Sequence, residues 1–261
     1  MKKIIFIGLL AFLAAALWQL PLSYAKPYAE KAVKGLKLNN VSGTVWNGEA
    51  KQLIANNTDF ENVKWNVKPL QSLTSLSLKF DFDIKSRDFT ANGLAGITPS
   101  KTLIISNTTF YLNASYLNKQ IKVAKISGDI KGTIKYAEIN EQDLPLIDGV
   151  INWKEAAVSS PIKLPQGDYQ AIITPDSGNL KIQLSSSDAP VELDGKITLN
   201  KEWIYKTDLN IKATDPNLAP MMGLIGQKQA DGTVNIKQQG DLKPYIGKLR
   251  NKVWAWITKA N

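Results

Sequence analysis

Residues 76–84 read Leu-Ser-Leu-Lys-Phe-Asp-Phe-Asp-Ile, an unbroken alternation of apolar and polar side chains. Successive side chains of a β-strand point to opposite faces, so this segment predicts a strand with one apolar face and one wet face. A helix would instead need apolar residues every three or four positions. The stretch therefore points to a β-structure for the chain around it.

The same two-residue period recurs along most of the chain. Other apolar positions with this spacing are Val63, Trp65 and Val67, then Leu180, Ile182 and Leu184, Val191 and Leu193, Ile197 and Leu199, Trp203, Tyr205, Leu209 and Ile211, and Val234 and Ile236. Turn-forming pairs such as Asn92-Gly93, Asp194-Gly195 and Asp231-Gly232 separate the runs. The pattern predicts an all-β fold, a long antiparallel meander that curls into an open groove or a sandwich-like sheet.

Composition excludes the commonest kinds of catalytic site. The 261 residues include no cysteine and no histidine, which removes thiolate metal sites, disulfides and the usual general base. Carboxylates such as Asp81 and Asp83 remain, and on the wet face of a strand they are interpreted as solvated side chains. We therefore expect no enzymatic activity, no metal and no cofactor. The net charge of +9 favours acidic partners such as anionic lipid head groups.

The amino-terminal segment has the character of a membrane anchor. No charge occurs between Lys3 and Lys26, and as a helix this segment spans roughly 33 Å at ~1.5 Å per residue, enough to cross a bilayer core. A cleaved signal peptide that ends at Ser23-Tyr24-Ala25 is the alternative. The side chains expected in the membrane are Ile4, Phe6, Leu9, Leu10, Phe12, Leu17 and Trp18.

The anchor divides the chain into three parts. Residues 1–25 form the signal anchor, with a cytoplasmic amino terminus favoured by Lys2 and Lys3. Residues 26–242 form the β-domain outside the cytoplasm, and residues 26–36 begin it as a short helix. Residues 243–261 have apolar side chains at helical spacing with several lysines, which predicts an amphipathic tail helix. That helix either touches an anionic membrane surface or caps the open end of the sheet.

Two tryptophan-bearing segments stand out from the other strands. Residues 41–50 read Val-Ser-Gly-Thr-Val-Trp-Asn-Gly-Glu-Ala, and residues 63–69 read Val-Lys-Trp-Asn-Val-Lys-Pro. A third segment, residues 149–153, reads Gly-Val-Ile-Asn-Trp. Taken alone, the first two segments describe a tryptophan-rich hairpin that packs its own core. The positions that define the three motifs are Gly43, Trp46, Gly48, Trp65, Pro69, Gly149 and Trp153.

In this order and spacing, the three motifs resemble the type II secretion system protein N family (general secretion pathway protein N). The resemblance covers roughly residues 1–242, and residues 241–261 extend past the usual closing segment. It implies a Gram-negative bacterial inner-membrane protein with a periplasmic domain and no enzymatic activity. Its implied partners are other inner-membrane or periplasmic subunits of the secretion system. A fainter resemblance to AsmA-like envelope proteins implies an anchored, curved β-sheet.

Two functions remain open at the level of sequence. One is a single-pass subunit of the secretion machinery that docks other subunits through a strand edge or face, in the export of folded proteins across the outer membrane. The other is an apolar-groove protein that binds or conveys lipid in the envelope. Membrane lipid is an expected partner of the amino-terminal helix, and of the carboxy-terminal tail if the tail lies on the membrane. Nucleic acid is rejected as a partner, because the domain is expected outside the cytoplasm.

Overall fold

The computed structural model describes residues 15–55, 58–119, 121, 124–140, 142–160, 163–218, 220, 222–223 and 227–244. The helices are α2 (Leu22–Ala32), α3 (Pro69–Ser75) and the 3-10 helix η1 (Ala114–Lys119). The strands are β1 (Leu36–Gly43), β2 (Asn47–Ala55), β3 (Thr58–Val67), β4 (Leu78–Lys85), β5 (Phe89–Ile97), β6 (Leu103–Asn113), β7 (Lys125–Ile139), β8 (Leu146–Ser160), β9 (Leu164–Asp176), β10 (Asn179–Ser187), β11 (Val191–Leu199), β12 (Ile204–Ala213), β13 (Gln227–Lys228) and β14 (Val234–Asp241).

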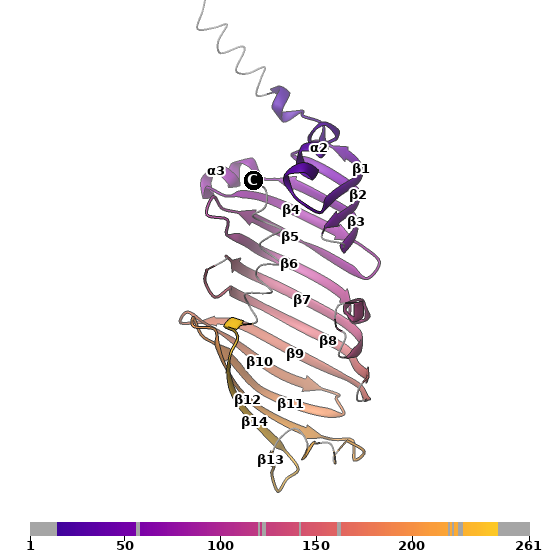
Figure 1. Ribbon diagram of the computed structural model, residues 1–261, viewed down its shortest axis with the longest axis vertical. Helices are drawn as coiled ribbons and strands as arrows, with labels where there is room; N and C mark the ends of the chain where they lie inside the picture. The colour runs from indigo at the N-terminus through magenta and orange to yellow at the C-terminus, as the bar shows by residue number, and fades with distance from the viewer. Residues whose placement is uncertain are drawn as a thin grey trace, which may run out of the picture.

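All of these strands belong to one sheet. The sheet has 14 strands in the order β1 to β12, then β14, then β13, and neighbouring strands are antiparallel (Figure 1). The predicted long antiparallel meander is therefore confirmed, and the alternating segment at residues 76–84 contains most of β4. Each strand from β1 to β11 pairs with the next along the chain, because short turns link one apolar-polar repeat to the next.

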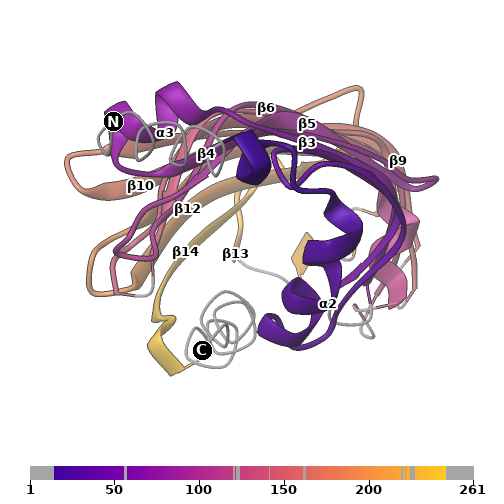
Figure 2. The same ribbon diagram turned by 90° about the horizontal axis from the view of Figure 1, so that it is seen from above.

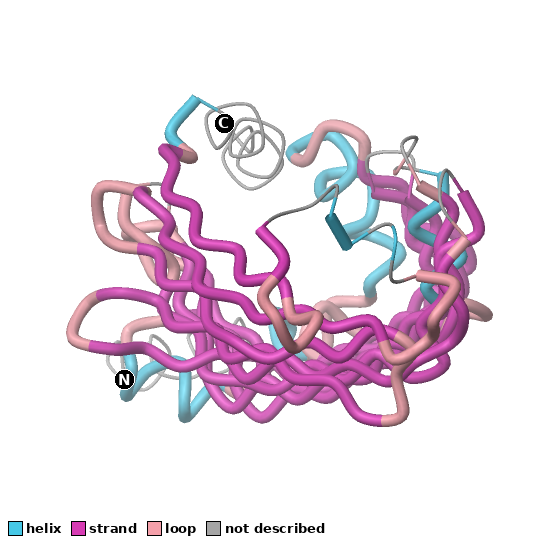
Figure 3. Tube along the Cα trace, turned by 90° about the horizontal axis from the view of Figure 1, so that it is seen from below, coloured by secondary structure: helices cyan, strands magenta, loops and turns pink. Residues whose placement is uncertain are grey.

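The sheet is curled and open, and within the described residues no second sheet covers it. Seen end-on, the strands superpose in an arc with α2 on its inner side (Figures 2 and 3). Right-handed twist coils any long sheet, and β-bulges add further bending. The register shifts at bulges in β5, β7 and β8. Of the two predicted forms, the open groove is the one observed.

The buried interior contains few large side chains. Seven of the buried apolar residues are alanines, and the largest side chain with less than 2% exposure is Val234. A folded domain normally buries Leu, Ile and Phe most completely, under a second layer of structure. Here most large apolar side chains of the sheet are only half-buried, so its apolar face remains accessible.

The two edges of the sheet differ. The residues before β1 contact it and the turn that follows it: the Leu38 N–H of β1 donates to the Glu30 carboxylate at 2.7 Å, Pro21 forms a bridge with Thr44, and the Val45 N–H donates to the Leu20 carbonyl at 3.2 Å. At the other end, β13 pairs with β14 only at Val234 and Asn235, so residues 236–241 have no outer strand among the described residues. An unpaired edge presents backbone donors and acceptors to any incoming strand.

The helix before the sheet begins earlier than predicted. It was expected over 26–36, but α2 runs from Leu22 to Ala32 because Pro21 precedes it and Leu22 is buried. Within the described ranges, none of the helices has the length and apolar character that a bilayer crossing requires. The predicted anchor lies outside these ranges up to residue 14, and so does most of the predicted tail helix, from residue 245 onward.

Candidate functional site

The register of the sheet joins apolar residues from successive strands into one continuous row. The row takes one residue from each of β1 to β12 and from β14: Val41, Ala50, Val63, Ile84, Ala91, Phe110, Gly132, Ile151, Ala171, Leu184, Gly195, Leu209 and Ile236. Side chains directly opposite each other on paired strands lie on the same face. One face of the sheet is therefore apolar along its whole length.

The next row, on the opposite face, is mainly polar. It runs through Glu49, Lys64, Asp83, Asn92, Thr109, Thr133, Val150, Ile172, Gln183, Lys196, Asp208 and Lys237. This is the one-sided alternation expected of an antiparallel sheet with one wet face. Asp81 and Asp83, the sequence candidates for acid–base chemistry, each pair with a lysine, Lys68 and Lys85 respectively. They behave as a solvated, charge-balanced surface.

The apolar face contains a pocket of about 450 Å³ that extends from β7 to β12. Ligand pockets in proteins typically measure ~300–1,000 Å³ and are lined mostly by apolar groups. The side chains that line this one include Ile151, Trp153, Tyr169, Ala171, Leu184 and Ile211. The pocket contacts six consecutive strands at once. The apolar face is therefore the hollow side of the curled sheet.

Two aromatic rings form one wall of this pocket. The ring centroids of Trp153 and Tyr169 lie 6.4 Å apart. The Trp153 indole N–H donates to the Ser127 carbonyl at 3.1 Å, and the Tyr169 hydroxyl donates to the Val191 carbonyl at 3.3 Å. Burial raises the pKa of the Tyr169 hydroxyl. Since backbone oxygens satisfy the polar ends of both rings, the wall offers mainly apolar surface to a ligand.

A bulge in β8 adjoins this aromatic wall. The register between β8 and β9 shifts after Trp153, and Glu155 has a φ of 50°. Asp168 on β9 holds the bulge: its carboxylate accepts from the Lys154 ammonium at 2.6 Å and from the Glu155 N–H at 2.9 Å. These two donors, the ammonium first, hold the pKa of the Asp168 carboxyl below its usual value. The bulge lets β8 bend beside the pocket.

We expect Asp168→Asn to destabilise the fold at neutral pH and to have little effect in acid. A carboxyl whose pKa is lowered by folding contributes stability above its unfolded pKa, and that contribution is lost as pH falls through the folded pKa. The difference in thermal midpoint between the parent chain and the variant should therefore shrink below about pH 4. Circular dichroism melts across this range measure it.

The matched control is Asp148→Asn. The Asp148 carboxylate lies 3.6 Å from the Lys135 ammonium and accepts no backbone N–H among the described hydrogen bonds. Its replacement should therefore change the thermal midpoint less. Equal effects of the two substitutions at neutral pH would contradict the role given to Asp168.

The tryptophan motif joins the start of the described chain to the sheet. The Trp46 ring stacks on Trp18 with centroids 5.7 Å apart, and its indole N–H donates to the Leu17 carbonyl at 2.9 Å. The Trp65 indole donates to the Val45 carbonyl at 3.0 Å. A Cβ added to Gly48 would lie 2.5 Å from the Trp65 ring, so only glycine leaves room for that side chain.

The remaining motif residues have backbone roles. Gly43 has a φ of +83°, and a Cβ there would lie 2.3 Å from the Asn47 carbonyl oxygen. Pro69 is the first residue of α3. A Cβ on Gly149 would approach the Thr133 carbonyl to 2.7 Å, and Trp153 lines the pocket. Of the predicted membrane residues, Leu17 and Trp18 are exposed at 60% and 55%, and Ile4, Phe6, Leu9, Leu10 and Phe12 lie outside the described residues.

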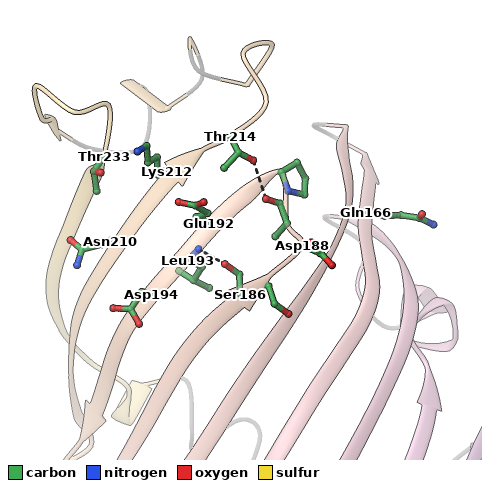
Figure 4. Close-up of a pocket in the computed structure, with 13 residues that line it drawn as sticks. Gln166, Ser186, Asp188, Glu192, Leu193, Asp194, Asn210, Lys212, Thr214 and Thr233 are labelled. Atoms are coloured by element: carbon green, nitrogen blue, oxygen red, sulfur yellow. Dashed lines mark hydrogen bonds between the residues drawn. The ribbon is translucent and has the colours of Figure 1, made fainter.

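A second, polar pocket of about 800 Å³ lies near the loop between β10 and β11 (Figure 4). Glu192, Asp194, Asn210 and Lys212 line it, all from β11 and β12. Within the described part of the chain, no three acidic side chains come together as metal ligands would. This pocket combines opposite charges on the wet face, and we assign it no ligand.

Several features of the site were not predicted from the sequence. The bulge at Glu155, its Asp168 clamp and Tyr169 in the aromatic wall were all missed. Glycines inside strands, such as Gly128 and Gly167, were the available signal, because an interior glycine often marks a bulge or a close backbone approach. A Cβ on Gly128 would lie 2.5 Å from the Lys154 carbonyl, directly at the bulge.

Comparison with known proteins identifies the family. The sequence profile described as "Type II secretion system (T2SS), protein N" matches residues 34–237, which include all strands from β1 to β13. The chain is 22% identical to the Type II secretion system protein N of Klebsiella pneumoniae over 251 residues, covering 92% of this chain and 97% of that protein. No solved structure gives a significant match. The chain therefore belongs to the type II secretion system protein N family.

Proposed function

We propose that the chain is an inner-membrane subunit of the type II secretion machinery, with its amino terminus in the cytoplasm and its sheet in the periplasm. Family membership supports the role in secretion. The uncharged segment before Lys26 supports the anchor, and the strand-rich domain follows it directly. We assign the chain no catalytic reaction, since its family is a component of the secretion machinery.

The observation that carries the proposed docking role is a difference between the two edges of the sheet in what contacts them. The chain that precedes β1 hydrogen-bonds to Leu38 and to the turn after the strand, whereas β14 beyond Asn235 has no outer strand among the described residues. A strand of another subunit can extend the sheet there by β-augmentation, in which backbone hydrogen bonds supply the affinity. Residues 237–239 on this edge are exposed.

We expect a photo-cross-linking residue in place of Gln239 to capture another secretion subunit in cells that secrete. The matched control is the same probe in place of Gln183, a glutamine on the wet face of the interior strand β10, and it should capture much less. If the variant at Gln239 reaches the membrane fraction but captures no secretion subunit, docking at the β14 edge is contradicted.

A second candidate function rests on the open groove. The continuous apolar row and the pocket of about 450 Å³ fit an elongated apolar ligand such as a phospholipid acyl chain, as the AsmA-like alternative supposes. Burying apolar area contributes about 25 cal/mol per Å², so even part of an acyl chain would bind measurably. Mass spectrometry of lipid that co-purifies with the chain is the direct measurement.

A further inference from the structure

Exposed apolar side chains gather at the β1 end of the molecule. Of the twelve large ones that the described part of the chain exposes, nine lie in residues 17–28 and 70–78. A soluble surface normally scatters such residues singly, and a cluster of them marks a binding or membrane-contacting surface. The second group belongs to α3 and the start of β4, beside the sheet near its β1 end (Figure 1).

The short helix α3 has its polar and apolar sides reversed. The exposed fractions of Leu70, Leu73 and Leu76 are 80%, 74% and 77%, whereas Ser77 is buried, with only 4% of its surface exposed. Hydrogen bonds fix this orientation: the Ser72 hydroxyl donates to the Lys68 carbonyl at 2.7 Å and accepts from the Lys79 N–H at 2.9 Å. The Ser72 side of α3 is therefore bound to the sheet, and the leucines face outward.

The backbone that leads into α3 is linked to the start of the described chain through Trp46. Trp18 stacks on Trp46, and the Trp46 carbonyl accepts the Val67 N–H at 2.7 Å, two residues before α3 begins. Leu17 and Trp18 follow directly on the apolar residues 4–16. Tryptophan prefers the boundary between lipid and water, so this stack fits the level of the bilayer surface.

One lysine near α3 is left to face an anionic surface. Between Glu61 and Asp81 the chain has three lysines and no acidic residue, but Lys64 pairs with Glu49 and Lys68 pairs with Asp81, so only Lys79 is in no ion pair among the described residues. Exposed leucines combined with nearby lysines are the pattern of segments that lie in the interface of a membrane rather than across it. We propose that Leu70 and Leu73 of α3, with Leu76 directly after it, insert into the surface of the same bilayer that holds the amino-terminal segment. The proposal rests on the anchoring proposed above.

The experiment uses the full chain in vesicles of phosphatidylethanolamine and phosphatidylglycerol. Because the chain has no cysteine, Leu73→Cys accepts a single environment-sensitive fluorophore without further changes. We expect its emission to shift to the blue and to be quenched by nitroxide-labelled lipid. The matched control is Leu146→Cys, another exposed leucine at the start of β8, which should show neither effect. Far-ultraviolet circular dichroism verifies that both variants keep the sheet.

Flotation of the vesicles separates the two proposals. If the chain floats with the vesicles but the label at Leu73 is not quenched, anchoring stands and the α3 contact is overturned. Equal quenching at Leu73 and Leu146 also overturns it, because the contact would then not belong to α3. If co-expressed secretion subunits, and not lipid, protect Leu73→Cys from labelling, the leucines bind protein and the lipid proposal is overturned. A chain that does not float overturns both proposals.

Discussion

Replacing Gly48 with alanine is expected to lower the free energy of unfolding by about 2–3 kcal/mol, the effect of overpacking a tight site. The added Cβ would lie 2.5 Å from the Trp65 ring and 2.8 Å from the Thr44 carbonyl oxygen. The ring is held by its indole hydrogen bond to Val45, and the carbonyl belongs to the backbone, so neither can move away easily. Urea titration followed by tryptophan fluorescence measures the change.

Gly223→Ala is the matched control for this substitution. A Cβ at Gly223 meets no atom of the described residues within 4 Å, so the same chemical change there should leave the urea midpoint almost unaltered. A Gly48→Ala chain as stable as Gly223→Ala would show that the Trp65 ring does not need the space over Gly48. The family motif would then need another physical explanation.

Replacing Ala171 with tryptophan is expected to reduce co-purified lipid about tenfold. Ala171 lies in the apolar row between Ile151 and Leu184 and lines the pocket, so a tryptophan ring would fill the space in which an acyl chain would lie. Displacing even ~60 Å² of apolar contact costs about 1.5 kcal/mol at ~25 cal/mol per Å², which is a tenfold loss of affinity. Mass spectrometry of extracted lipid, normalised to protein, measures the result.

The matched control for this second substitution is the next residue on the same strand. Ile172 lies on the opposite face of β9 with 38% of its surface exposed, so Ile172→Trp places the same ring on the wet side. It should leave the bound lipid unchanged. If the two variants retain equal amounts of lipid, or if the parent chain holds none, the groove does not bind lipid.

Local alternation was enough to predict most of the sheet. The apolar positions at 78–84 and 180–184 fall on one face of β4 and β10, because a strand with one covered face must alternate with period two. Leu76 was predicted on the same face, but it lies before β4 and is 77% exposed. The predicted turn at Asp231-Gly232 does link two antiparallel strands, but the turns predicted at Asn92-Gly93 and Asp194-Gly195 were wrong, because these pairs lie inside β5 and β11. The motif residues Trp46, Gly48 and Trp65 are close together in space, as expected for neighbouring strands.

Features that depend on the curvature and cover of the sheet were not predictable in the same way. Whether a curled sheet closes on itself depends on the sum of small twists and bulges, such as the one at Glu155, which leave little trace in the sequence. The outward-facing leucines of α3 were not predicted, because leucines at this spacing are typical of a buried helix face. Only the burial of Ser77 in the structure shows which side faces the sheet. The open edge of β14 could not be predicted either, because it depends on how little of the strand β13 covers.

The strictly sequential pairing from β1 to β12 has a consequence for how the chain acquires its structure. Every pairing in this series joins segments that are neighbours in the sequence, so none has to wait for a distant part of the chain to arrive. Low contact order of this kind favours rapid folding. A chain that emerges from its amino terminus can therefore add one hairpin after another to a growing sheet that starts at β1 and ends with β14.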